Sequence, residues 1–389
     1  MKTLTITWIS YNNYGTLLQA YALQQKLEQL GCSNTILYDA EALNRQFAGK
    51  DYKKPQPDPQ TLTEKLIRLL RTPGRLTRRL SARFDMERYK KPYHASWDAM
   101  EDFRAQDLKI HYGASMDELE QLDLEYDAYV CGSDQVWSVH TNMFNPFYYL
   151  NFTAKPRIAY APSMGTDNIP PETADEIREL LQDFTAVSVR EETCAQRLRE
   201  ITGRDVSWVL DPTLLHRRSF WEQFSDGVQI PNEKYLLCYF LGNRPWYFDY
   251  AQAMARKLKL KLLLIPSTWD YLQYPFTARF GVGPREFVAL FRNAAFVLTD
   301  SYHGSIFSTI FEREFLYLQR FRDDDPRSQN IRVESLFGGL GLSQRIVSTD
   351  TKPTRPAPID YRAVNKKLAA MRRFSEDYLK TSLDAAENS

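Results

Sequence analysis

The sequence lacks any hydrophobic run long enough to cross a membrane as a helix. Apolar residues make up 43% of its 389 residues, but no stretch approaches the roughly 20 consecutive apolar residues that a spanning helix needs. The first nine residues, MKTLTITWI, alternate polar and apolar side chains. This alternation indicates a strand, and the apolar stretch is too short for a signal peptide and has no small-residue cleavage site. We therefore expect a cytoplasmic protein.

Cysteines are few and widely spaced. The four of them are Cys32, Cys131, Cys194 and Cys238, and no two form a CxxC pair. Disulfide frameworks and structural metal sites normally show tighter spacing or higher density. Cys131 and Cys238 lie in apolar runs, which indicates buried thiols in a reducing compartment.

The sequence also lacks a charge excess and the common catalytic motifs. Fifty Lys and Arg residues face 49 Asp and Glu residues, for a net charge of +1. Nucleic-acid-binding proteins usually show a clear basic excess, so we expect no nucleic-acid partner. No Walker A, HExxH, GxSxG or paired-cysteine pattern occurs, which weakens ATPase, metalloprotease and serine hydrolase hypotheses. We expect neither a metal nor a cofactor.

Apolar segments alternate with amphipathic ones in two series, a pattern typical of parallel α/β sheets. Because one core rarely exceeds roughly 250–300 residues, we predict two Rossmann-like domains facing a cleft, at 1–215 and 230–350. The C-terminal stretch 355–389 contains a polar amphipathic helix that packs outside or crosses back to the first domain. The predicted strands are 3–9, 35–38, 128–131, 157–161, 186–189, 206–210, 235–240, 260–265, 296–299 and 315–318.

Residues 50–110 interrupt the first series. From Lys65 to Lys91 there are ten basic residues and two acidic ones, with leucines between them. This composition predicts a helical insert with one basic face. The face is either solvated, as charge runs usually are, or in peripheral contact with anionic lipid headgroups or a lipid diphosphate at the inner face of the membrane.

Polar residues follow several predicted strands, and ligands in open α/β sheets bind beyond the carboxyl ends of the strands. His303 follows strand 296–299 and begins a helix. Its ring can donate a proton near neutral pH, and the helix N-terminus favours an anion. Asp300 is a candidate to orient the ring. The alternative is that Asp300 and Ser301 cap the helix while His303 only packs.

Arg190 ends strand 186–189 and can hold a carboxylate or phosphate with its two-pronged guanidinium. The alternative is a surface salt bridge to Glu191 and Glu192. The loops 132–135 and 163–165 contain small residues that let a ligand approach the backbone, or they are only tight turns. The segment 13–16, NYGT, is not a GxGxxG motif, but it is a fair candidate for anion or sugar contact.

Taken together, these motifs resemble the polysaccharide pyruvyl transferase family, in the order that the family shows. No single motif is specific. The matching stretches are NYGTLLQAYALQ at 13–24, GSDQVW at 132–137, YAPSMG at 160–165, VSVRE at 187–191, DPT at 211–213 and TDSYHG at 299–304.

The resemblance implies a glycosyltransferase-B-like fold and transfer of pyruvate from phosphoenolpyruvate (PEP) to a sugar. The product is a ketal on a capsular, exopolysaccharide or cell-wall precursor, for which a lipid-diphosphate-linked acceptor is the expected form. Arg190 matches the family's PEP-binding arginine, and His303 its PEP ligand or general acid. The other candidates are Ser301, Gly304, Ser163 and Arg332 for PEP, Asp134 and Asp300 for proton transfer, and Asn13, Tyr14, Thr16, Ser133 and Gln135 for the acceptor.

The chain departs from the family pattern at two positions. Ser301 stands where some members have arginine, so a second cation for PEP must come from elsewhere. Thr16 stands where some members have aspartate, which leaves the role of its loop open. The candidate cations are Arg332, Arg327, Arg322 and Lys155.

Two other functions compete with pyruvyl transfer. One is a nucleotide-sugar-dependent glycosyltransferase of the same architecture, although no clear acidic ribose-binding pattern occurs in the second series. The other is a non-catalytic carbohydrate-binding scaffold, against which the presence of both Arg190 and His303 argues.

Overall fold

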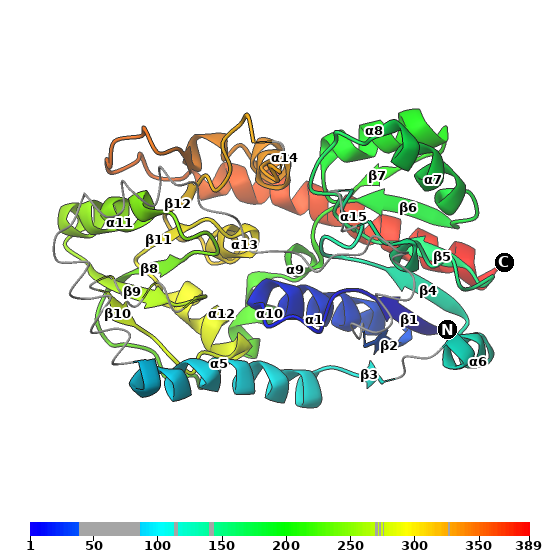
Figure 1. Ribbon diagram of the computed structural model, residues 1–389, viewed down its shortest axis with the longest axis horizontal. Coiled ribbons are helices and arrows are strands. Elements are labelled where there is room, and N and C mark those ends of the chain that lie inside the picture. Colours follow the sequence, from blue (N-terminus) through cyan, green and yellow to red (C-terminus); the bar gives the residue numbers. More distant parts are fainter. Residues whose placement is uncertain are drawn as a thin grey trace.

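The computed structural model describes residues 1–38, 86–112, 116–139, 144–268, 271, 274, 276–325 and 327–389. These residues form two α/β domains that lie side by side, with one sheet in each (Figure 1). The side chains of residues 65–91 are outside the described set, so the basic-face hypothesis remains a prediction. No helix among the described residues is long and apolar enough to cross a membrane.

Both sheets are parallel and have the strand order of a Rossmann-type fold. The first runs β3-β2-β1-β4-β5-β6-β7 and the second β10-β9-β8-β11-β12-β13, so in each the order reverses beside the first strand of that domain. This confirms the predicted fold class of two Rossmann-like domains. The strands are β1 (Lys2–Ile6), β2 (Ser33–Leu37), β3 (Ile110–His111), β4 (Ala128–Cys131), β5 (Arg157–Ala159), β6 (Ala186–Val189), β7 (Ser207–Trp208), β8 (Tyr235–Tyr239), β9 (Lys261–Ile265), β10 (Thr277–Ala278), β11 (Phe296–Thr299), β12 (Phe315–Leu318) and β13 (Ile346–Val347).

Helices cover the sheets, as the alternating pattern predicts. Central strands such as β4 and β11 are buried along their whole length, because helices lie on both faces of a doubly wound sheet. The helices are α1 (Tyr14–Gln29), α5 (Met86–Asp107), α6 (Met116–Glu125), α7 (Pro171–Leu181), α8 (Glu192–Thr202), α9 (Pro212–Leu215), α10 (Arg218–Phe224), α11 (Pro245–Leu258), α12 (Pro284–Asn293), α13 (Tyr302–Ile310), α14 (Ile331–Leu340) and α15 (Tyr361–Glu387).

A continuous apolar cluster joins the two domains. It contains residues of α1 in the first domain and of α12 and α13 in the second. At its centre the Tyr14 ring stacks on Phe287, with ring centroids 4.5 Å apart, and the Tyr14 hydroxyl donates to the carbonyl of Val282. Apolar burial of this kind holds the domains together more firmly than a small polar contact does.

Two long helices also connect the domains. In α5, Arg104 donates to the carbonyl of Ile9 in the first domain, and the Tyr93 hydroxyl donates to the carbonyl of Ser267 in the second. Helix α15 contacts α14 in the second domain and β5 in the first, where the Tyr378 hydroxyl donates to the carbonyl of Ala159. In the view of Figure 1, α5 lies along one side of both domains and α15 crosses between them.

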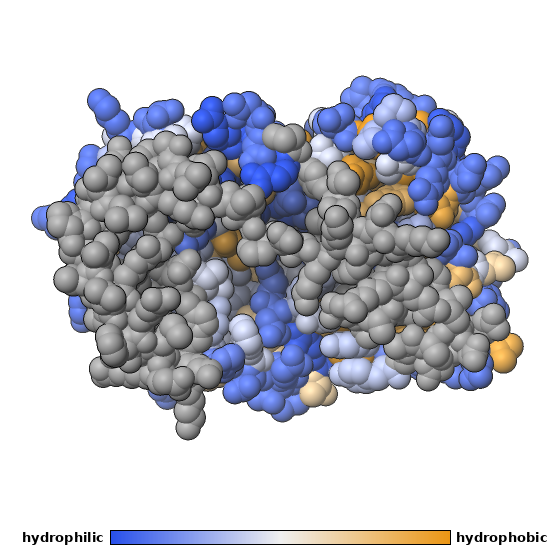
Figure 2. All heavy atoms as spheres, in the orientation of Figure 1, coloured by the Kyte–Doolittle hydropathy of each residue, from blue (hydrophilic) through white to orange (hydrophobic). Residues whose placement is uncertain are grey.

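The surface of the described residues is mainly hydrophilic in this view, and hydrophobic residues show mostly in recesses (Figure 2). Among the described residues, the large apolar side chains that are exposed are Tyr11, Trp97, Tyr112, Leu124 and Phe374.

His216 lies in the connection between the domains, directly after α9. Its Nε2 is 2.8 Å from the carbonyl oxygen of Ala22 in α1, and its ring stacks on Phe220. Burial lowers the pKa of His216 from 6.5 to about 4. The unfolded chain therefore binds a proton at a higher pH than the folded one does, and the folded state loses stability as the pH falls below about 6.5.

We predict that His216→Gln flattens this pH dependence. Between about pH 7.5 and about pH 5, His216 should cost the wild-type protein about 2 kcal/mol of unfolding free energy, and the variant should lack this loss. Urea denaturation at both pH values measures the difference. The control is His111→Gln, which removes a histidine from the edge strand β3. Parallel losses in wild type and His216→Gln would show that another group is responsible.

Candidate functional site

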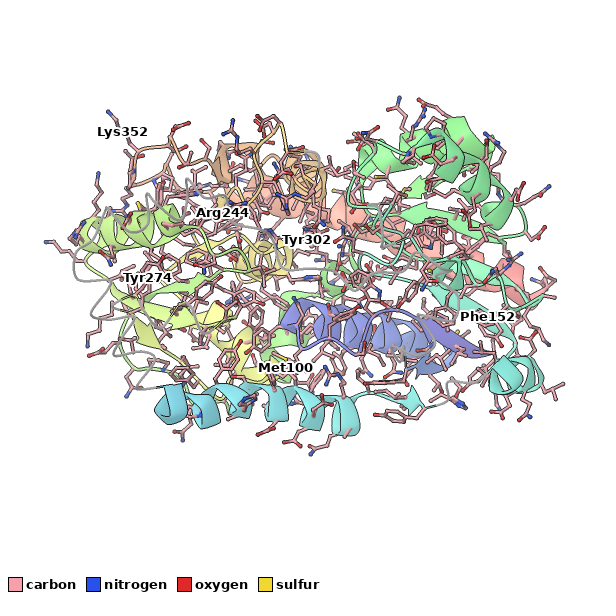
Figure 3. The ribbon with its side chains drawn as sticks, in the orientation of Figure 1. Met100, Phe152, Arg244, Tyr274, Tyr302 and Lys352 are labelled. Carbon is pink, nitrogen blue, oxygen red and sulfur yellow. The ribbon has the colours of Figure 1, made fainter. Side chains whose placement is uncertain are left out.

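The candidate residues meet where the carboxyl ends of the two sheets face each other. The loops after β4, β5, β6 and β7 come from the first domain, and the loops after β11 and β12 from the second. These loops surround the points where the strand order reverses, which are the ligand-binding points of open α/β sheets. Tyr302, the first residue of α13, lies near the middle of the molecule (Figure 3).

Asp211 is the residue that contacts candidate residues from both domains. It lies between β7 and α9, as the residue that precedes α9, and is fully buried. Its Oδ2 lies 3.0 Å from Nη1 of Arg190 and 3.4 Å from Nε2 of His303. Its Oδ1 accepts from the main-chain N–H and the hydroxyl of Thr213, which fixes the carboxylate at the start of α9.

The charge of Asp211 is held by its neighbours. Burial alone would raise the pKa of this carboxyl, but the facing His303 and Arg190 lower the pKa well below its usual value. Asp211 is therefore ionised at neutral pH. One carboxylate thus bridges an arginine of the first domain and a histidine of the second.

Arg190 is buried in a ring of acids, so its ion pair with Glu191 exists but is not at the surface, where the alternative placed it. Only 2% of it is exposed. Besides Asp211, it lies 3.4 Å from Oε1 of Glu191 and 3.8 Å from Oδ1 of Asp134. Its guanidinium stacks over the Tyr302 ring, 4.6 Å from the ring centroid. This last contact ties the first domain to the start of α13 in the second.

The His303 ring is packed against a glycine of the first domain. An added Cβ at Gly15 would lie 2.1 Å from Nδ1 of His303, so only glycine leaves room for the ring. Ser301 caps α13, because its hydroxyl accepts from the N–H of Gly304. The capping that the alternative gave to Ser301 is therefore present, and its side chain supports the helix whose first turn carries His303. PEP binding by Ser301 stays a prediction.

The hypothesis that Asp300 orients the His303 ring needs correction. Both oxygens of Asp300 accept main-chain N–H groups of the loop after β8, from Leu241 at 2.6 Å and Gly242 at 2.7 Å. The carboxylate beside the ring is Asp211. The DPT motif contained Asp211, but nothing in its spacing to His303 pointed to this contact.

The loop after β4 supplies further polar groups. The backbone of Asp134 is left-handed (φ 65°). Its carboxylate accepts hydrogen bonds from the Thr16 hydroxyl, at 2.7 Å, and from the main-chain N–H of Gln135. The Ser133 hydroxyl donates to the carbonyl of Ala161 and is 3.5 Å from Asp211. Thr16, Ser133, Asp134 and Gln135 are therefore part of the same cluster as Arg190 and His303.

Two predicted acceptor residues have structural partners instead. The Asn13 side chain accepts from the N–H groups of Gly15 and Thr16 and so caps α1. The Tyr14 hydroxyl donates to Val282 across the domain interface. These contacts give both residues a role in positioning the loop that surrounds His303.

Three buried donor nitrogens in this cluster have no aligned hydrogen-bond partner. They are Nη2 of Arg190, Nε2 of His303 and Nε2 of Gln135. Buried polar groups in native proteins are nearly always satisfied, so such donors indicate a polar ligand. Donors of this kind, close to one another at strand ends, match an anion.

The four candidate cations are placed very differently. Arg327 pairs with Asp325, and Arg322 with Asp324. Lys155 precedes β5, at the opposite end of the sheet from the site. Arg332 lies in the first turn of α14, and its charge interacts with those of Arg190 and Glu191. Arg332 is therefore the candidate that belongs to the site. Sequence reasoning missed Arg320, after β12, which also interacts with Arg332.

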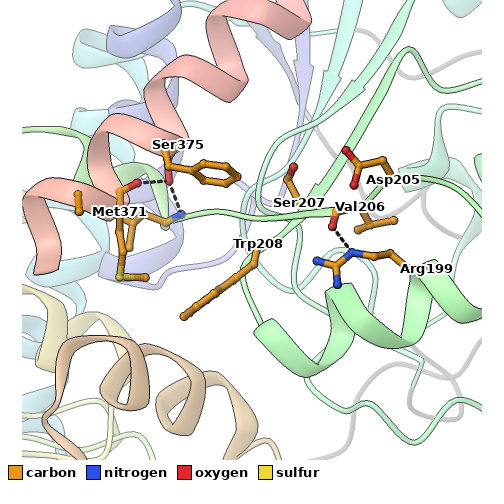
Figure 4. Close-up of a pocket in the computed structure, with 10 residues that line it drawn as sticks. Arg199, Asp205, Val206, Ser207, Trp208, Met371 and Ser375 are labelled. Atoms are coloured by element: carbon orange, nitrogen blue, oxygen red, sulfur yellow. Dashed lines mark hydrogen bonds between the residues drawn. The ribbon is translucent and has the colours of Figure 1, made fainter.

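A separate hollow lies behind the site, between β7 and α15 (Figure 4). It is lined by Trp208, Met371 and Phe374 among others. The Trp208 indole N–H donates to the carbonyl of Arg190 at 3.1 Å. Through this hydrogen bond, one residue that lines the hollow contacts the backbone of Arg190.

Two facing Rossmann-like domains, with a buried cluster of charged residues between their strand ends, make up a glycosyltransferase-B-like fold. The chain belongs to the polysaccharide pyruvyl transferase family, whose profile matches residues 13–320. No curated protein matches the chain.

Several solved structures are similar over most of the chain. A UDP-GlcNAc 2-epimerase from Neisseria meningitidis bound to UDP-GlcNAc is 11% identical, with a TM-score of 0.47 and coverage of 98% of this chain and 94% of that chain. A putative UDP-N-acetylglucosamine 2-epimerase from Listeria monocytogenes is 12% identical, with a TM-score of 0.48 and coverage of 98% and 91%. An E. coli heptosyltransferase with ADP is 11% identical, with a TM-score of 0.39 and coverage of 95% and 100%.

We predict that Gly15→Ala displaces the His303 ring. The overlap with Nδ1 should cost about 1–3 kcal/mol of unfolding free energy, as overpacking usually does. The matched control is Gly338→Ala in α14, where an added Cβ meets nothing within 4 Å. The control should be neutral or stabilising by up to about 1 kcal/mol.

Denaturation curves measure the stabilities of both variants, and imidazole NMR spectra of the protein's five histidines follow the ring. Equal stabilities and an unshifted His303 signal in Gly15→Ala would contradict the predicted contact.

Proposed function

We propose that this protein transfers the pyruvate group of phosphoenolpyruvate to two hydroxyls of a sugar in a glycan precursor and releases phosphate. The observation that carries the proposal is the pairing of Arg190 and His303. They come from different domains and share the carboxylate of Asp211. Each also has a buried donor nitrogen that makes no hydrogen bond: the nearest carboxylate oxygen is 3.4 Å from Nε2 of His303 and 3.8 Å from Nη2 of Arg190. In a chain of the pyruvyl transferase family, a small, multiply charged anion such as PEP fits these donors.

In this proposal the donor lies between the two domains. Nη2 of Arg190 and Nε2 of Gln135 donate to its anionic groups, and the N-terminus of α13 adds a favourable dipole. His303 is held beside the donor by Asp211 on one side and by the close approach of Gly15 on the other. A fixed ring in this position suits proton transfer, because general acids work only within hydrogen-bond reach.

The reaction balances with one proton delivered and two removed. Protonated His303 gives its proton to the methylene carbon of PEP, and carbon 2 becomes cationic. A sugar hydroxyl attacks carbon 2 and loses its proton. The C–O bond to phosphate then breaks, and phosphate leaves with its electron pair. A second hydroxyl attacks the cation that forms, loses its proton and closes the ketal. Of the two protons lost, one restores His303 and the other leaves with phosphate.

The carboxylates have different roles in this scheme. Asp211 stays ionised and stabilises the protonated ring of His303, as its low pKa requires. Asp134, held by Thr16 in the loop after β4, is the proposed base that takes each hydroxyl proton and passes it on, one to His303 and one to the departing phosphate. Asp300 does not serve as a base, because both of its oxygens accept main-chain N–H groups. Thr16 and Ser133 are the proposed acceptor-side contacts, whereas Gln135, an acceptor candidate from its sequence position, is assigned to the donor in this scheme.

The acceptor is proposed by chemical class only. Two hydroxyls on one hexose are needed to close the ketal ring. A lipid-diphosphate-linked oligosaccharide of a capsule, exopolysaccharide or cell-wall polymer is the proposed form. A panel of lipid-linked or aryl galactosides, glucosides and N-acetylmannosaminides, with release of phosphate from PEP as the readout, identifies the sugar.

We predict that PEP, and not a UDP-sugar, raises the melting temperature of the wild-type protein. A ligand at 100 times its Kd adds about 2.7 kcal/mol to the stability of the folded state. Arg190→Lys keeps the charge but loses the two-pronged geometry, so it should weaken the PEP-induced shift. Thermal unfolding with each ligand measures this. A shift with UDP-sugar and none with PEP would favour the glycosyltransferase alternative, and no shift with either would favour a scaffold.

We also predict that His303→Ala lowers the rate of phosphate release from PEP by about 10²–10⁴-fold, the usual contribution of a general acid. His111→Ala, on the edge strand β3, is the matched control and should keep the wild-type rate. Circular dichroism checks that both variants are folded. Release of phosphate at the wild-type rate by folded His303→Ala would remove His303 from the mechanism.

A further inference from the structure

The acids around Arg190 create a shortage of positive charge at the site. Asp134, Glu191 and Asp211 all lie within 3.8 Å of its guanidinium. Burial raises the pKa of Glu191 more than the neighbouring Arg190 lowers it. Even without a charge on Glu191, the ionised Asp211 already neutralises the single positive charge of Arg190. A donor that carries both a carboxylate and a phosphate needs further cations, because buried charges must be paired.

Arg332 is the cation at this site whose hydrogen bonds go to neutral groups. Its Nε and Nη2 donate to the carbonyl and the side-chain oxygen of Gln329, at 3.3 and 2.8 Å. Burial, and then the positive charges of Arg320 and Arg190, lower its pKa to about 10. Arg332 is thus repelled by two other guanidinium groups, and among the described residues no carboxylate lies within ion-pair distance of it, although the charge of Glu191 acts in its favour.

Arg320 is the second arginine whose charge acts on Arg332, and its own side chain is supported by neighbours in the second domain. It follows β12, and its guanidinium lies over the Phe321 ring. Its charge is balanced by Asp300, which is itself fixed by the amides of Leu241 and Gly242. Nε of Arg320 is buried and has no hydrogen-bond partner. Arg320 therefore offers a fixed donor on the second-domain side of the cluster.

The two arginines also differ from Arg190 and His303 in exposure. Arg320 and Arg332 are partly exposed, whereas Arg190 and His303 are buried. The most strongly hydrated group of the donor, its phosphate, is best placed at the partly exposed arginines. The less charged carboxylate and the carbon skeleton then lie deeper, near Arg190 and His303.

Resting on the proposed function, we propose that Arg332, with Arg320 beside it, binds the phosphate group of the donor and supplies the second cation that Ser301 does not provide. The proposal gives Asp300 a purpose: it positions Arg320 rather than His303. It also has a cost, because Arg332 repels its neighbours until an anion binds. Removing the charge of Arg332 should therefore stabilise the ligand-free protein and lower the affinity of the protein for phosphate.

The test compares Arg332→Gln with Arg332→Lys, wild type and Arg322→Gln. Arg322 is an exposed arginine of the same connection, paired with Asp324, and serves as the matched control. Calorimetry measures binding of PEP, inorganic phosphate and pyruvate to each protein, and thermal unfolding measures stability without ligand.

We expect Arg332→Gln to bind PEP and inorganic phosphate about 10- to 100-fold more weakly, the effect of a lost charge-assisted hydrogen bond. Its affinity for pyruvate should not change, and its melting temperature without ligand should equal or exceed that of wild type. Arg332→Lys should recover part of the affinity for phosphate, and Arg322→Gln should behave as wild type. A purely structural arginine would instead lower the melting temperature and affect all three ligands alike.

Three results would overturn the inference: unchanged PEP and phosphate affinity in Arg332→Gln, an equal loss of affinity for pyruvate, or a lower melting temperature without ligand. Wild-type protein that binds no inorganic phosphate would overturn it too. The proposed function fails separately. If wild type binds phosphate through Arg332 but releases none from PEP with any acceptor, the phosphate subsite stands and pyruvyl transfer is wrong.

Discussion

The site depends on one buried carboxylate that is shared between two domains. Asp211 belongs to the first domain, yet one of its oxygens faces both Arg190 and His303. An uncompensated charge in the interior is costly, so the arginine, the aspartate and the histidine must stay together. The hydrogen bonds from Thr213 to the other oxygen fix Asp211 at the start of the connection between the domains. These charged contacts therefore fix the position of His303 in the second domain relative to Arg190 in the first.

The apolar interface makes this arrangement durable. Domains that meet through small polar surfaces usually move relative to each other, but here α1 packs its Tyr14 ring onto Phe287 of the second domain within a continuous core. Helices α5 and α15 contact both domains as well. Because Gly15 begins the same α1 helix and touches the His303 ring, packing at the interface also sets the position of the proposed general acid.

The charges on the second-domain side form a relay of supports. Main-chain amides fix Asp300, Asp300 balances Arg320, and Arg320 crowds Arg332. Through these contacts, two arginines are held near the place where a donor anion is proposed to bind. A site that contains uncompensated cations is less stable without its ligand than a neutral one, and this trade-off is common where binding requires pre-arranged charge.

The fold class, most of the strands and two members of the site were predictable from the sequence. Apolar runs between polar loops located β4, β6, β11 and β12 at both ends, because such runs are a local property. Two-residue strands such as β3 and β10 gave no such signal. Arg190 and His303 were recognised as strand-end residues. Three features could be seen only in the folded protein: which carboxylate faces His303, why residue 15 is glycine, and which arginine accompanies Arg190. These contacts join residues far apart in the chain, and their geometry depends on how the two domains pack.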